Sequence, residues 1–566
     1  MTKLAAFFGN ISITVLLLKD DGVQLLQLPM KTMKIKPLEL ALIAFFLVLA
    51  VLAGWLIVAD VDSKTAQEKE PSPSRKPLLV NQNTEASNTG RTPRRSSSFS
   101  DKKDEPFFAR PNERLVQFNN EEDYQKFLNA LSSSDLRLIR SLDSLRAAWI
   151  GFDNLSDFDG LVDPDELGFN FVVGLPLPPG QGSVQAGAIG FNGNALEWLG
   201  ITSDNSQWGE GVTLAVIDSG ISPHSALPEG IQRIDLVGDS DPSGLLNGHG
   251  TAVASLIAGT NGITPGVSPS VTLLDVRVSD ASGLSSSFLL AEGIVAAVEG
   301  GAQVINISLG SYGDSSLVAN AVAFASANGA VIVASSGNEG FDQPAFPAAY
   351  PEVIAVGAVD QAGVLVDFSN TGDDLDITAP GLEVFAAWTD NRYIEFTGTS
   401  GSAPLVSAAV ATAISELELS ANDAADAVLQ FANEAGAPGE DIQYGQGHLD
   451  VGRVTNSETP GIFDIAAVSN LLETDSGNSI ITVVQNQGTE VINGARLTIS
   501  TSFSEIPLPV PQLTPGSIHT VEVPTSLPPP GEELFISTEA TLNAAFQDAE
   551  PSNNLKETSF EFEAAP

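Results

Sequence analysis

The feature that most constrains this chain is an alternation of apolar segments between about residues 195 and 455. Short runs rich in Val, Ile and Ala are separated there by longer Ala-rich stretches of helical composition. The short runs are VTLAVID (212–218), SVTLLDVRV (270–278), AQVINISL (302–309), AVIVASS (330–336) and EVIAVGAV (352–359). Strands that are apolar on both faces are typical of a parallel sheet covered by helices on both sides. We therefore predict a three-layer α/β domain over residues 181–455.

Three polar motifs interrupt this domain in an order that suits nucleophilic catalysis. Asp218 ends the first apolar run, so it is expected at the carboxyl edge of the sheet, where sites of open α/β folds lie. His249 stands in NGHGTAVASLIAG, and Ser400 stands in FTGTSGSAP, a Gly-rich turn that leads into a helix. Taken singly, each residue also fits an ordinary structural role. Together they supply the hydroxyl, the base and the orienting carboxylate that amide hydrolysis through serine requires.

These motifs resemble the signature blocks of the subtilase family, the subtilisin-like serine proteases. The matching segments are DSG (218–220), HGT (249–251) and GTSGSAP (398–404), and the chain order Asp, His, Ser is the subtilisin order. The resemblance implies that Ser400 is the nucleophile, that His249 is the general base and later the acid, and that Asp218 holds the imidazole tautomer. Three further histidines lack such flanks: His224, His448 and His519.

The resemblance extends to the oxyanion site and the substrate cleft. VIVASSGNEG (331–340) resembles the segment whose asparagine binds the oxyanion, which implies Asn338 together with the backbone amide of Ser400. INISLGS (305–311) and SSGN (335–338) match the two edges of the family's cleft, between which a peptide would add as a strand. Glu339 matches an acidic rim position that favours basic substrate side chains, although a solvated loop carboxylate fits equally well. The implied substrate-binding residues are Ser308, Leu309, Gly310, Ser335, Ser336, Gly337 and Glu339.

Two departures from the family pattern leave the reacting groups in place. Ala252 and Val253 follow the HGT block, and Gly401-Ser402 replaces the usual Met-Ala after the serine. The departures make the helix packing and the leaving-group pocket uncertain. The loop after the histidine helix, GTNGITPGVSP, is short for a calcium site, so structural calcium is not assignable, and no cofactor is expected for the chemistry.

The amino-terminal part is predicted to carry an export signal. The run LELALIAFFLVLAVLAGWLIVA (38–59) is long enough to cross a bilayer, with lysines before it and acidic residues after it. A signal peptide and an uncleaved membrane anchor, within 34–59, both remain open. The protein is thus expected to be secreted, periplasmic or at the cell surface. Translation that begins at Met30 or Met33 would explain the awkward apolar stretch ISITVLLL ahead of this segment.

A linker and a small folded region are predicted next. Residues 60–110 are rich in Ser, Pro, Asn, Lys and Arg and are expected to be a disordered tether. Residues 111–180 predict the order strand, helix, strand, strand, short helix over FDGLVDPDEL, strand. This α+β order resembles the inhibitory prosegment of subtilases, so the chain's own prosegment is an expected inhibitor. The Pro- and Gly-rich stretch that follows predicts self-processing somewhere between 174 and 195.

The carboxyl-terminal part, residues 460–566, loses the helix alternation. Strand candidates such as IITVVQNQG, GARLTIST, HTVEVP and LFISTEATLN are separated by Pro and Gly, which predicts an antiparallel sandwich of the immunoglobulin class. QDAEPSNNLKE resembles adhesion-type modules of secreted proteins. Asp475, Asp548 and Glu550 are candidate calcium ligands, with solvated loop carboxylates as the alternative.

Composition excludes several function classes. The chain has no cysteine, so disulfides, thiol catalysis and thiolate metal sites are excluded. Its formal net charge is −44, and residues 181–455 contain four arginines and no lysine, so no nucleic-acid partner is expected. The acidic surface indicates either adaptation for solubility and salt or attraction of cationic substrates.

The predicted function is that of a secreted or membrane-tethered serine endopeptidase acting on proteins or peptides and made as a zymogen. One alternative is a surface adhesin with a silent subtilase-like domain, which the intact set of reacting residues disfavours. Another is an esterase or peptide ligase that uses the same residues with a different acyl acceptor. The membrane would be a partner only through residues 38–59.

Overall fold

The computed structural model describes residues 106, 108–176, 184–238, 247–474 and 477–562, together with the backbone of two short strands near the amino terminus. Those two strands, β1 (Ile13–Lys19) and β2 (Gly22–Leu28), form an antiparallel hairpin in the first of two compact units. The predicted export segment at 34–59 and nearly all of the predicted linker at 60–110 lie outside the described residues. Among the described residues, no helix by itself has the length and apolarity to cross a membrane, and only the bent pair Thr399–Glu416 with Ala421–Gln430 passes that test jointly.

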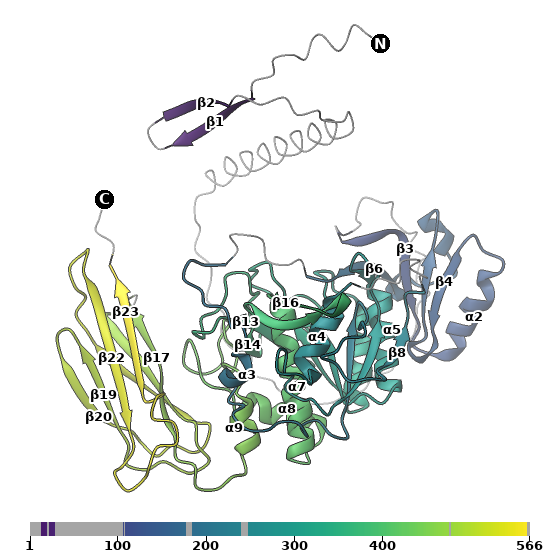
Figure 1. The fold of residues 1–566 in the computed structure, drawn as a ribbon. Coiled ribbons are helices and arrows are strands. Elements are labelled where there is room, and N and C mark those ends of the chain that lie inside the picture. The colour runs from purple at the N-terminus through teal and green to yellow at the C-terminus, as the bar shows by residue number, and fades with distance from the viewer. Residues whose placement is uncertain are drawn as a thin grey trace, which may run out of the picture. The chain divides into compact units, whose positions relative to one another are not determined.

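The largest sheet has seven parallel strands in the order β14-β13-β12-β11-β7-β9-β8 (Figure 1). All residues of β11, β12 and β13, three of its inner strands, are buried, as their continuous apolar sequences predict. The strands are β7 (Thr213–Asp218), β8 (Gln232–Asp235), β9 (Thr272–Arg277), β11 (Val304–Ile307), β12 (Val331–Ser335), β13 (Val353–Val359) and β14 (Ile377–Pro380).

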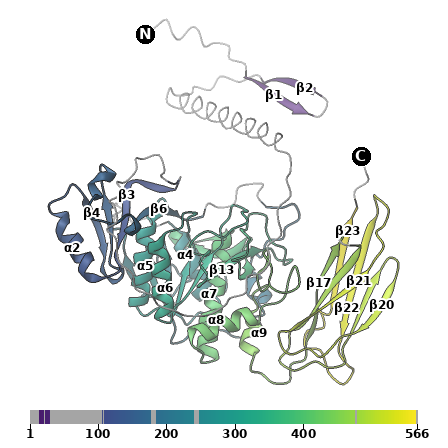
Figure 2. The same cartoon turned by 180° about the vertical axis from the view of Figure 1, so that it is seen from behind.

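Helices cover both faces of this sheet. Along β7, Leu214 and Val216 belong to one apolar cluster, and Ala215 and Ile217 belong to another, because successive side chains of a strand point to opposite faces. The first cluster contains α4 (His249–Ala258), α7 (Thr399–Glu416), α8 (Ala421–Gln430) and α9 (Val451–Asn456). The second contains α5 (Ser287–Glu299) and α6 (Ser316–Ala327), which Figure 2 shows side by side. The prediction of a three-layer α/β domain is confirmed. Smaller elements at its edge are α3 (Ala195–Trp198), the hairpin β15 (Val384–Trp388) and β16 (Arg392–Phe396), and the 3-10 turn η5 (Thr389–Asn391).

The region before this domain is a small α+β unit with its own apolar core. Helix α2 starts at Asn120, whose side chain accepts a bond from the backbone N–H of Asp123. Its elements are β3 (Ala109–Gln117), α2 (Glu121–Leu131), β4 (Arg137–Leu142), η2 (Asp143–Leu145), β5 (Ala147–Gly151) and β6 (Leu167–Gly174). The expected second helix is wrong: Gly160, with φ of +78°, and Pro164 break the segment into two 3-10 turns, η3 (Leu155–Phe158) and η4 (Pro164–Glu166).

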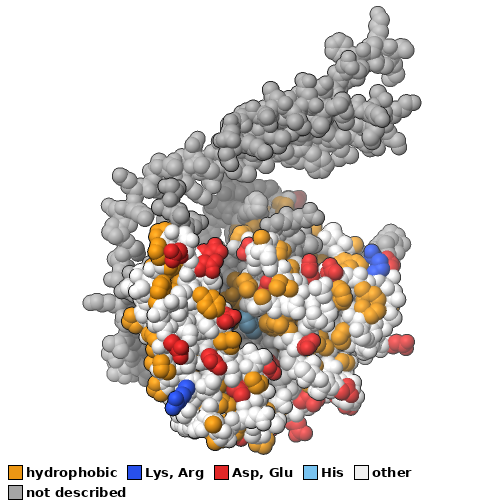
Figure 3. Space-filling view, turned by 60° about the vertical axis from the view of Figure 1, so that its left-hand side comes forward, with side chains coloured by type: hydrophobic (Ala, Val, Ile, Leu, Met, Phe, Trp, Pro, Cys, Tyr) orange, Lys and Arg blue, Asp and Glu red, His pale blue; other side chains and the backbone are white. Residues whose placement is uncertain are grey.

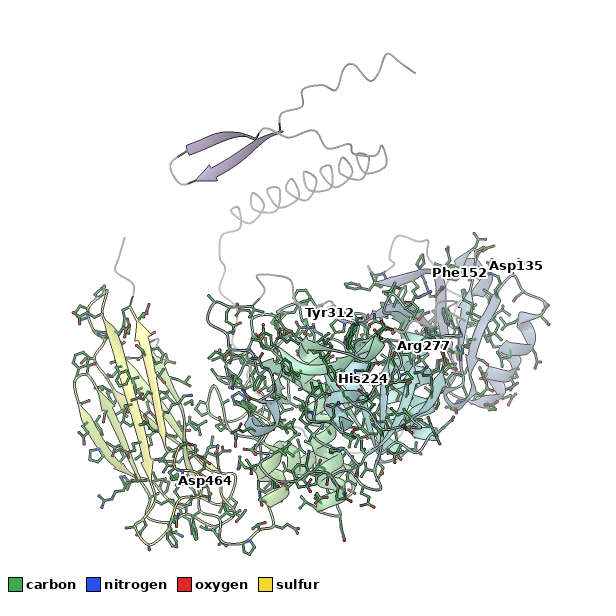
Figure 4. All side chains as sticks on the ribbon, viewed as in Figure 1. Asp135, Phe152, His224, Arg277, Tyr312 and Asp464 are labelled. Atoms are coloured by element: carbon green, nitrogen blue, oxygen red, sulfur yellow. The ribbon has the colours of Figure 1, made fainter. Side chains whose placement is uncertain are left out.

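The last region is rich in β structure. Two antiparallel sheets, β17-β18-β21 and β20-β19-β22-β23, share one apolar core. The strands are β17 (Ile465–Glu473), β18 (Ser479–Asn486), β19 (Arg496–Thr501), β20 (Glu505–Pro509), β21 (Ile518–Pro524), β22 (Glu533–Thr541) and β23 (Leu555–Glu561). The sequence patterns missed β17, β20 and β23, and the immunoglobulin class stays a prediction. Figure 4 labels a residue in each of three regions: Phe152 in the α+β unit, Tyr312 in the α/β domain and Asp464 in the β-rich region.

Buried polar contacts join the β-rich region to the α/β domain. The Gln485 side chain, 3% exposed, donates to the carbonyl of Ala432 and accepts from the backbone N–H of Glu434. The Arg453 side chain donates to the carbonyl of Gln487 at 3.0 Å. A chain cut at about residue 456 would therefore leave buried donors and acceptors unpaired, and we expect it to be less stable than the longer chain.

Glu434 at this junction predicts a pH-dependent stability. Burial raises its pKa to about 7, and the charge of Asp441 adds to this rise. A carboxyl whose pKa is higher in the folded chain binds its proton more tightly there, so its contribution to stability is full at low pH and is lost as the pH rises toward 7. Glu434→Gln should therefore raise the free energy of unfolding near pH 8 by up to about 3 kcal/mol and change it little near pH 4. Urea unfolding at both pH values, on chains that also carry Ser400→Ala to prevent autolysis, measures this, and an equal change at the two pH values would contradict it.

Candidate active site

Asp218 lies at the carboxyl end of β7 and is fully buried. Its carboxylate accepts three kinds of donor. The backbone N–H of Ser219 lies 2.6 Å from Oδ1, the Ser219 hydroxyl lies 2.9 Å from the same atom, and Nδ1 of His249 lies 2.9 Å from Oδ2 and 3.0 Å from Oδ1. These contacts fix the carboxylate against the imidazole and leave Nε2 of the ring on the opposite side.

His249 is the first residue of α4 and is 7% exposed. Its backbone N–H donates to Asn247 Oδ1 at 3.0 Å, and its ring packs edge-on against Phe396 with centroids 5.3 Å apart. The next residue must be glycine, because a Cβ on Gly250 would lie 2.8 Å from the carbonyl of Gly220 and 3.1 Å from Asp218 Oδ1. The glycine in the HGT motif is thus what lets the helix start close to the buried carboxylate.

Ser400 lies in the first turn of α7, where backbone N–H groups have no acceptor within the helix. Its hydroxyl donates to the carbonyl of Ser308 at 3.4 Å, and no hydrogen bond joins it to His249 among the described residues. Pro404 has no N–H to give to the carbonyl four residues earlier, so the Ser400 carbonyl is free of the helix. The Ser308 hydroxyl donates to that carbonyl instead, at 3.3 Å.

This substitute bond gives a prediction for Ser308→Ala. The change removes the donor to the buried Ser400 carbonyl and the acceptor of Asn306 Nδ2, which lies 3.0 Å away. We expect the free energy of unfolding to fall by about 1–3 kcal/mol, the cost of unpaired buried polar groups. Denaturant unfolding in the Ser400→Ala background measures it, with the exposed Ser326→Ala as control, and two equal losses would contradict the role of the bond.

Asn338 is held beside the start of α7. Its Oδ1 accepts from both the backbone N–H and the hydroxyl of Thr399, each at 2.9 Å. The amide nitrogen therefore faces Gly398, where an added Cβ would lie 2.8 Å from Nδ2, and the φ of +138° at Gly398 also suits glycine. The Asn338 side chain is thus bonded to the residue that directly precedes Ser400.

Comparison with known proteins identifies the family of the chain. The subtilase family profile matches residues 209–447. Alkaline elastase YaB from Bacillus sp. (strain YaB) is 33% identical over 312 residues, which cover 52% of this chain and 79% of that protein. Thermophilic serine proteinase from Bacillus sp. (strain AK1) is 37% identical over 249 residues, 43% of this chain and 62% of that protein. This chain belongs to the subtilase family.

One solved structure supports the fold alone. The epidermin leader peptide processing serine protease (EpiP) from Staphylococcus aureus aligns with a TM-score of 0.51 and 21% identity, over 61% of this chain and 98% of that one.

The family assignment makes the present chain a serine endopeptidase of the subtilisin type.

The predicted cleft residues of this subtilase divide into two groups. Gly310 exchanges two backbone hydrogen bonds with Gly174, both at 3.0 Å, so it pairs with the end of β6. Ser335 ends β12, and the buried Ser336 bonds to β13 and to the carbonyl of Asn370, so neither pairs with that strand. Leu309 is buried at 1% exposure. On its other edge, β6, the strand that contains Gly174, pairs with β10 (Leu284–Ser286). No sequence pattern predicted β10, because three residues are too few to show an alternation of polar and apolar side chains.

Glu339, the predicted rim residue of this subtilase's cleft, has hydrogen-bond partners within the chain. Its Oε2 accepts from the Tyr312 hydroxyl and from the backbone N–H of Asn338, the latter at 2.9 Å. Asn370 Nδ2 donates to the same tyrosine oxygen at 2.7 Å, and burial together with the bond to Glu339 raises the pKa of Tyr312. The Glu339 carboxylate is exposed to solvent and also accepts a hydrogen bond from the backbone of Asn338.

The departure after Ser400, Gly401-Ser402, has structural partners. Gly401 lies beside the Phe396 ring that packs on His249, where an added Cβ would make an ordinary contact of 3.4 Å. The Ser402 hydroxyl lies 3.1 Å from the carbonyl of Ala379 and 3.2 Å from that of Pro380, which ties α7 to β14.

An ion pair between the buried Asp275 and the partly exposed Arg233 supports the turn after Asp218. Asp275 Oδ2 accepts from Arg233 Nε at 2.6 Å and from the backbone N–H of Ile221 at 2.9 Å, and Arg233 also donates to the Ile221 carbonyl. Burial raises the pKa of Asp275, against the effect of Arg233. No sequence pattern predicted this pair. Asp275 and Arg233 together bind the N–H and the carbonyl of Ile221, three residues after Asp218.

Metal sites and surface charge complete the description. No group of three or more His, Cys, Asp or Glu residues within the described part of the chain is arranged to hold a metal ion. Asp548 accepts from the backbone N–H groups of Ile465 and Glu550, so it stabilises a turn, and Asp475 lies outside the described residues. Figure 3 shows acidic side chains spread over the face that is drawn, with Lys and Arg at few places.

Proposed function

We propose that Asp218, His249 and Ser400 form the catalytic triad of this peptidase and that Asn338 is an oxyanion donor. The observation that carries the proposal is the buried His249–Asp218 pair, whose histidine begins α4, a helix packed against α7, which carries Ser400 in its first turn. Only an imidazole held by a buried carboxylate is both oriented and stabilised when it takes a proton. All three residues lie at ends of elements that the apolar core fixes.

In this mechanism the Ser400 hydroxyl leaves the Ser308 carbonyl, gives its proton to Nε2 of His249 and attacks the substrate carbonyl. Asp218 stabilises the imidazolium that forms. Asn338 Nδ2 and the Ser400 backbone N–H bind the oxygen that becomes negative. His249 then protonates the leaving amine, and a water molecule, activated by the same imidazole, hydrolyses the acyl-enzyme.

Substrates are proposed to be proteins or peptides in extended conformation. The support is the pairing of Gly174 with Gly310 on one side and with β10 on the other, which is how a strand is held by main-chain bonds. Such binding reads the backbone and leaves side-chain preference to the pockets on either side of the strand.

The chain is further proposed to be a zymogen whose α+β unit is its prosegment and inhibitor. The unit contacts helices of the α/β domain through polar groups: Arg140 pairs with Glu292 at 2.9 Å, and Gln117 accepts from Asn320 at 2.7 Å. Its last strand enters the cleft, so it blocks access for other peptides until it leaves. Export through residues 38–59 is proposed from the sequence alone and is tested by fractionation of the native host.

A fluorophosphonate probe tests the triad directly, because it reacts only with an activated serine. The mature protein should be labelled on Ser400, and heat-denatured protein and Ser400→Ala should not be labelled. Labelling that is absent from native protein while the fold is intact would favour a silent, adhesin-like domain. Turnover of peptides against simple esters then separates a peptidase from an esterase.

A further inference from the structure

The last strand of the α+β unit continues into the substrate cleft. β6 pairs antiparallel with β10, with Val172, Val173 and Gly174 opposite Ser286, Ser285 and Leu284. Beyond the strand, the backbone N–H of Leu175 donates to the carbonyl of Gly283 at 3.0 Å. On its other edge Gly174 exchanges both bonds with Gly310. Residues 172–175 are thus held from both sides.

The register of this pairing points to one residue at the nucleophile. In an antiparallel pair each step forward on one chain is a step back on the other. Since Gly174 lies opposite Gly310, Leu175 falls opposite Leu309 and Pro176 falls opposite Ser308. The Ser308 carbonyl is the group that the Ser400 hydroxyl contacts at 3.4 Å. Pro176 is therefore the residue that the strand register brings to Ser400.

The hydrogen-bond pattern at this point agrees with that register. Bonded pairs alternate with non-bonded pairs in an antiparallel ladder, so the pair after Gly174–Gly310 that would exchange bonds is 176–308. An ordinary residue at 176 would donate its N–H to the Ser308 carbonyl. Proline has no N–H, and that carbonyl accepts from Ser400 instead.

We propose that self-processing breaks the peptide bond on the carboxyl side of Pro176, so that this cleft accepts proline immediately before the cleaved bond. The inference rests on the proposed function and adds to it the position of the cut. The sequence around it is Leu175-Pro176-Leu177-Pro178, in which the bonds before Pro176 and Pro178 are tertiary amides. In those two bonds the leaving nitrogen carries the bulky ring carbon Cδ in place of a hydrogen, which crowds it against the catalytic groups. The bond after Pro176 is an ordinary secondary amide.

The reaction balances as an acyl transfer to water. Ser400 Oγ forms a bond to the carbonyl carbon of Pro176, its proton passes to His249, and the carbon–nitrogen bond breaks as His249 returns that proton to the released amine. Water then hydrolyses the ester and leaves Pro176 with a carboxylate and Ser400 with its hydroxyl. The new carboxyl-terminal segment still pairs with Gly310 and β10, so it remains as an occupant of the cleft.

Intact-mass measurement of the full chain, expressed without other proteases, tests the inference. Wild type should give a fragment that ends at Pro176 and a partner fragment that begins at residue 177, and Ser400→Ala should give neither. A wild-type cut elsewhere would overturn the register while self-processing stands. A chain that is cut despite Ser400→Ala, or a wild type that is never cut, would overturn self-processing itself.

Two variants sharpen the test of the register. Pro176→Ala supplies the missing N–H to the Ser308 carbonyl, so we expect the same cut about two- to tenfold faster. The matched control Pro178→Ala turns the bond after Leu177 into an ordinary amide outside the paired strand, and it should leave the position of the cut unchanged. A cut that moves to follow Leu177 in this variant would overturn the register.

An inserted residue gives a result of opposite sign. One alanine placed between Leu175 and Pro176 puts the alanine opposite Ser308 and makes the bond at Ser400 a tertiary amide. Processing should then be lost while the folded precursor still accumulates. Cleavage that continues after the proline in this variant would show that the strand register does not select the bond.

Discussion

Replacing Ser400 by alanine is expected to lower kcat for peptide hydrolysis by roughly 10⁴- to 10⁶-fold and to leave the fold unchanged. The residues of a triad act as a unit, so the loss of the nucleophile removes nearly all of the covalent pathway. The small remaining rate comes from the oxyanion donors and substrate binding. His249→Ala should give a loss of similar size, because a serine hydroxyl without its base is a weak nucleophile at neutral pH.

The measurement uses a fluorogenic peptide, with wild type and variants folded in the same way with the prosegment in trans and freed of it before the assay. His519→Ala is the control for the histidine change, since His519 lies on β21 in the β-rich region and should keep full activity. Circular dichroism and thermal unfolding check that each variant is folded. Near-native turnover by folded Ser400→Ala would show that another residue carries the reaction.

Replacing Asn338 by aspartate is expected to lower kcat by roughly 10²- to 10³-fold with little change in KM. Aspartate keeps an oxygen that accepts from the backbone N–H and the hydroxyl of Thr399, so the side chain stays in place. It exchanges the Nδ2 donor for a second oxygen, which repels the developing oxyanion. The loss should therefore fall on the transition state and spare ground-state binding.

Two controls separate this effect from charge and from packing. Asn328→Asp adds the same charge at the exposed end of α6 and should leave kcat unchanged. Asn338→Ala removes both the donor and the acceptor, so it should show the same loss of kcat together with lower stability. A fall in KM and kcat together for Asn338→Asp, or no fall at all, would contradict the oxyanion role.

The order of apolar runs was enough to predict the parallel sheet, because strands buried on both faces leave a composition that no solvent-facing strand has. The glycines near His249 and Ser400 were visible in the sequence motifs, and the structure gives the reason for them. A side chain at Gly250 would crowd Asp218, and a side chain at Gly398 would crowd Asn338. The 3-10 turns in place of a second helix could have been foreseen from Gly160 and Pro164, since each breaks a helix at its own position.

The sequence by itself predicted the residues that we propose to carry the chemistry, and it determined the strand pattern that brings Asp218 to the edge of a sheet. Only the tertiary structure decided what holds them: β10 beside β6, Ser308 in place of the N–H that Pro404 lacks, and the Arg233–Asp275 pair under Ile221. These contacts join residues far apart in the chain, and a short strand or a single buried pair has no periodicity of its own. The local pattern of apolar residues shows which face of a segment is buried. Which other segment packs against that face depends on the fold as a whole.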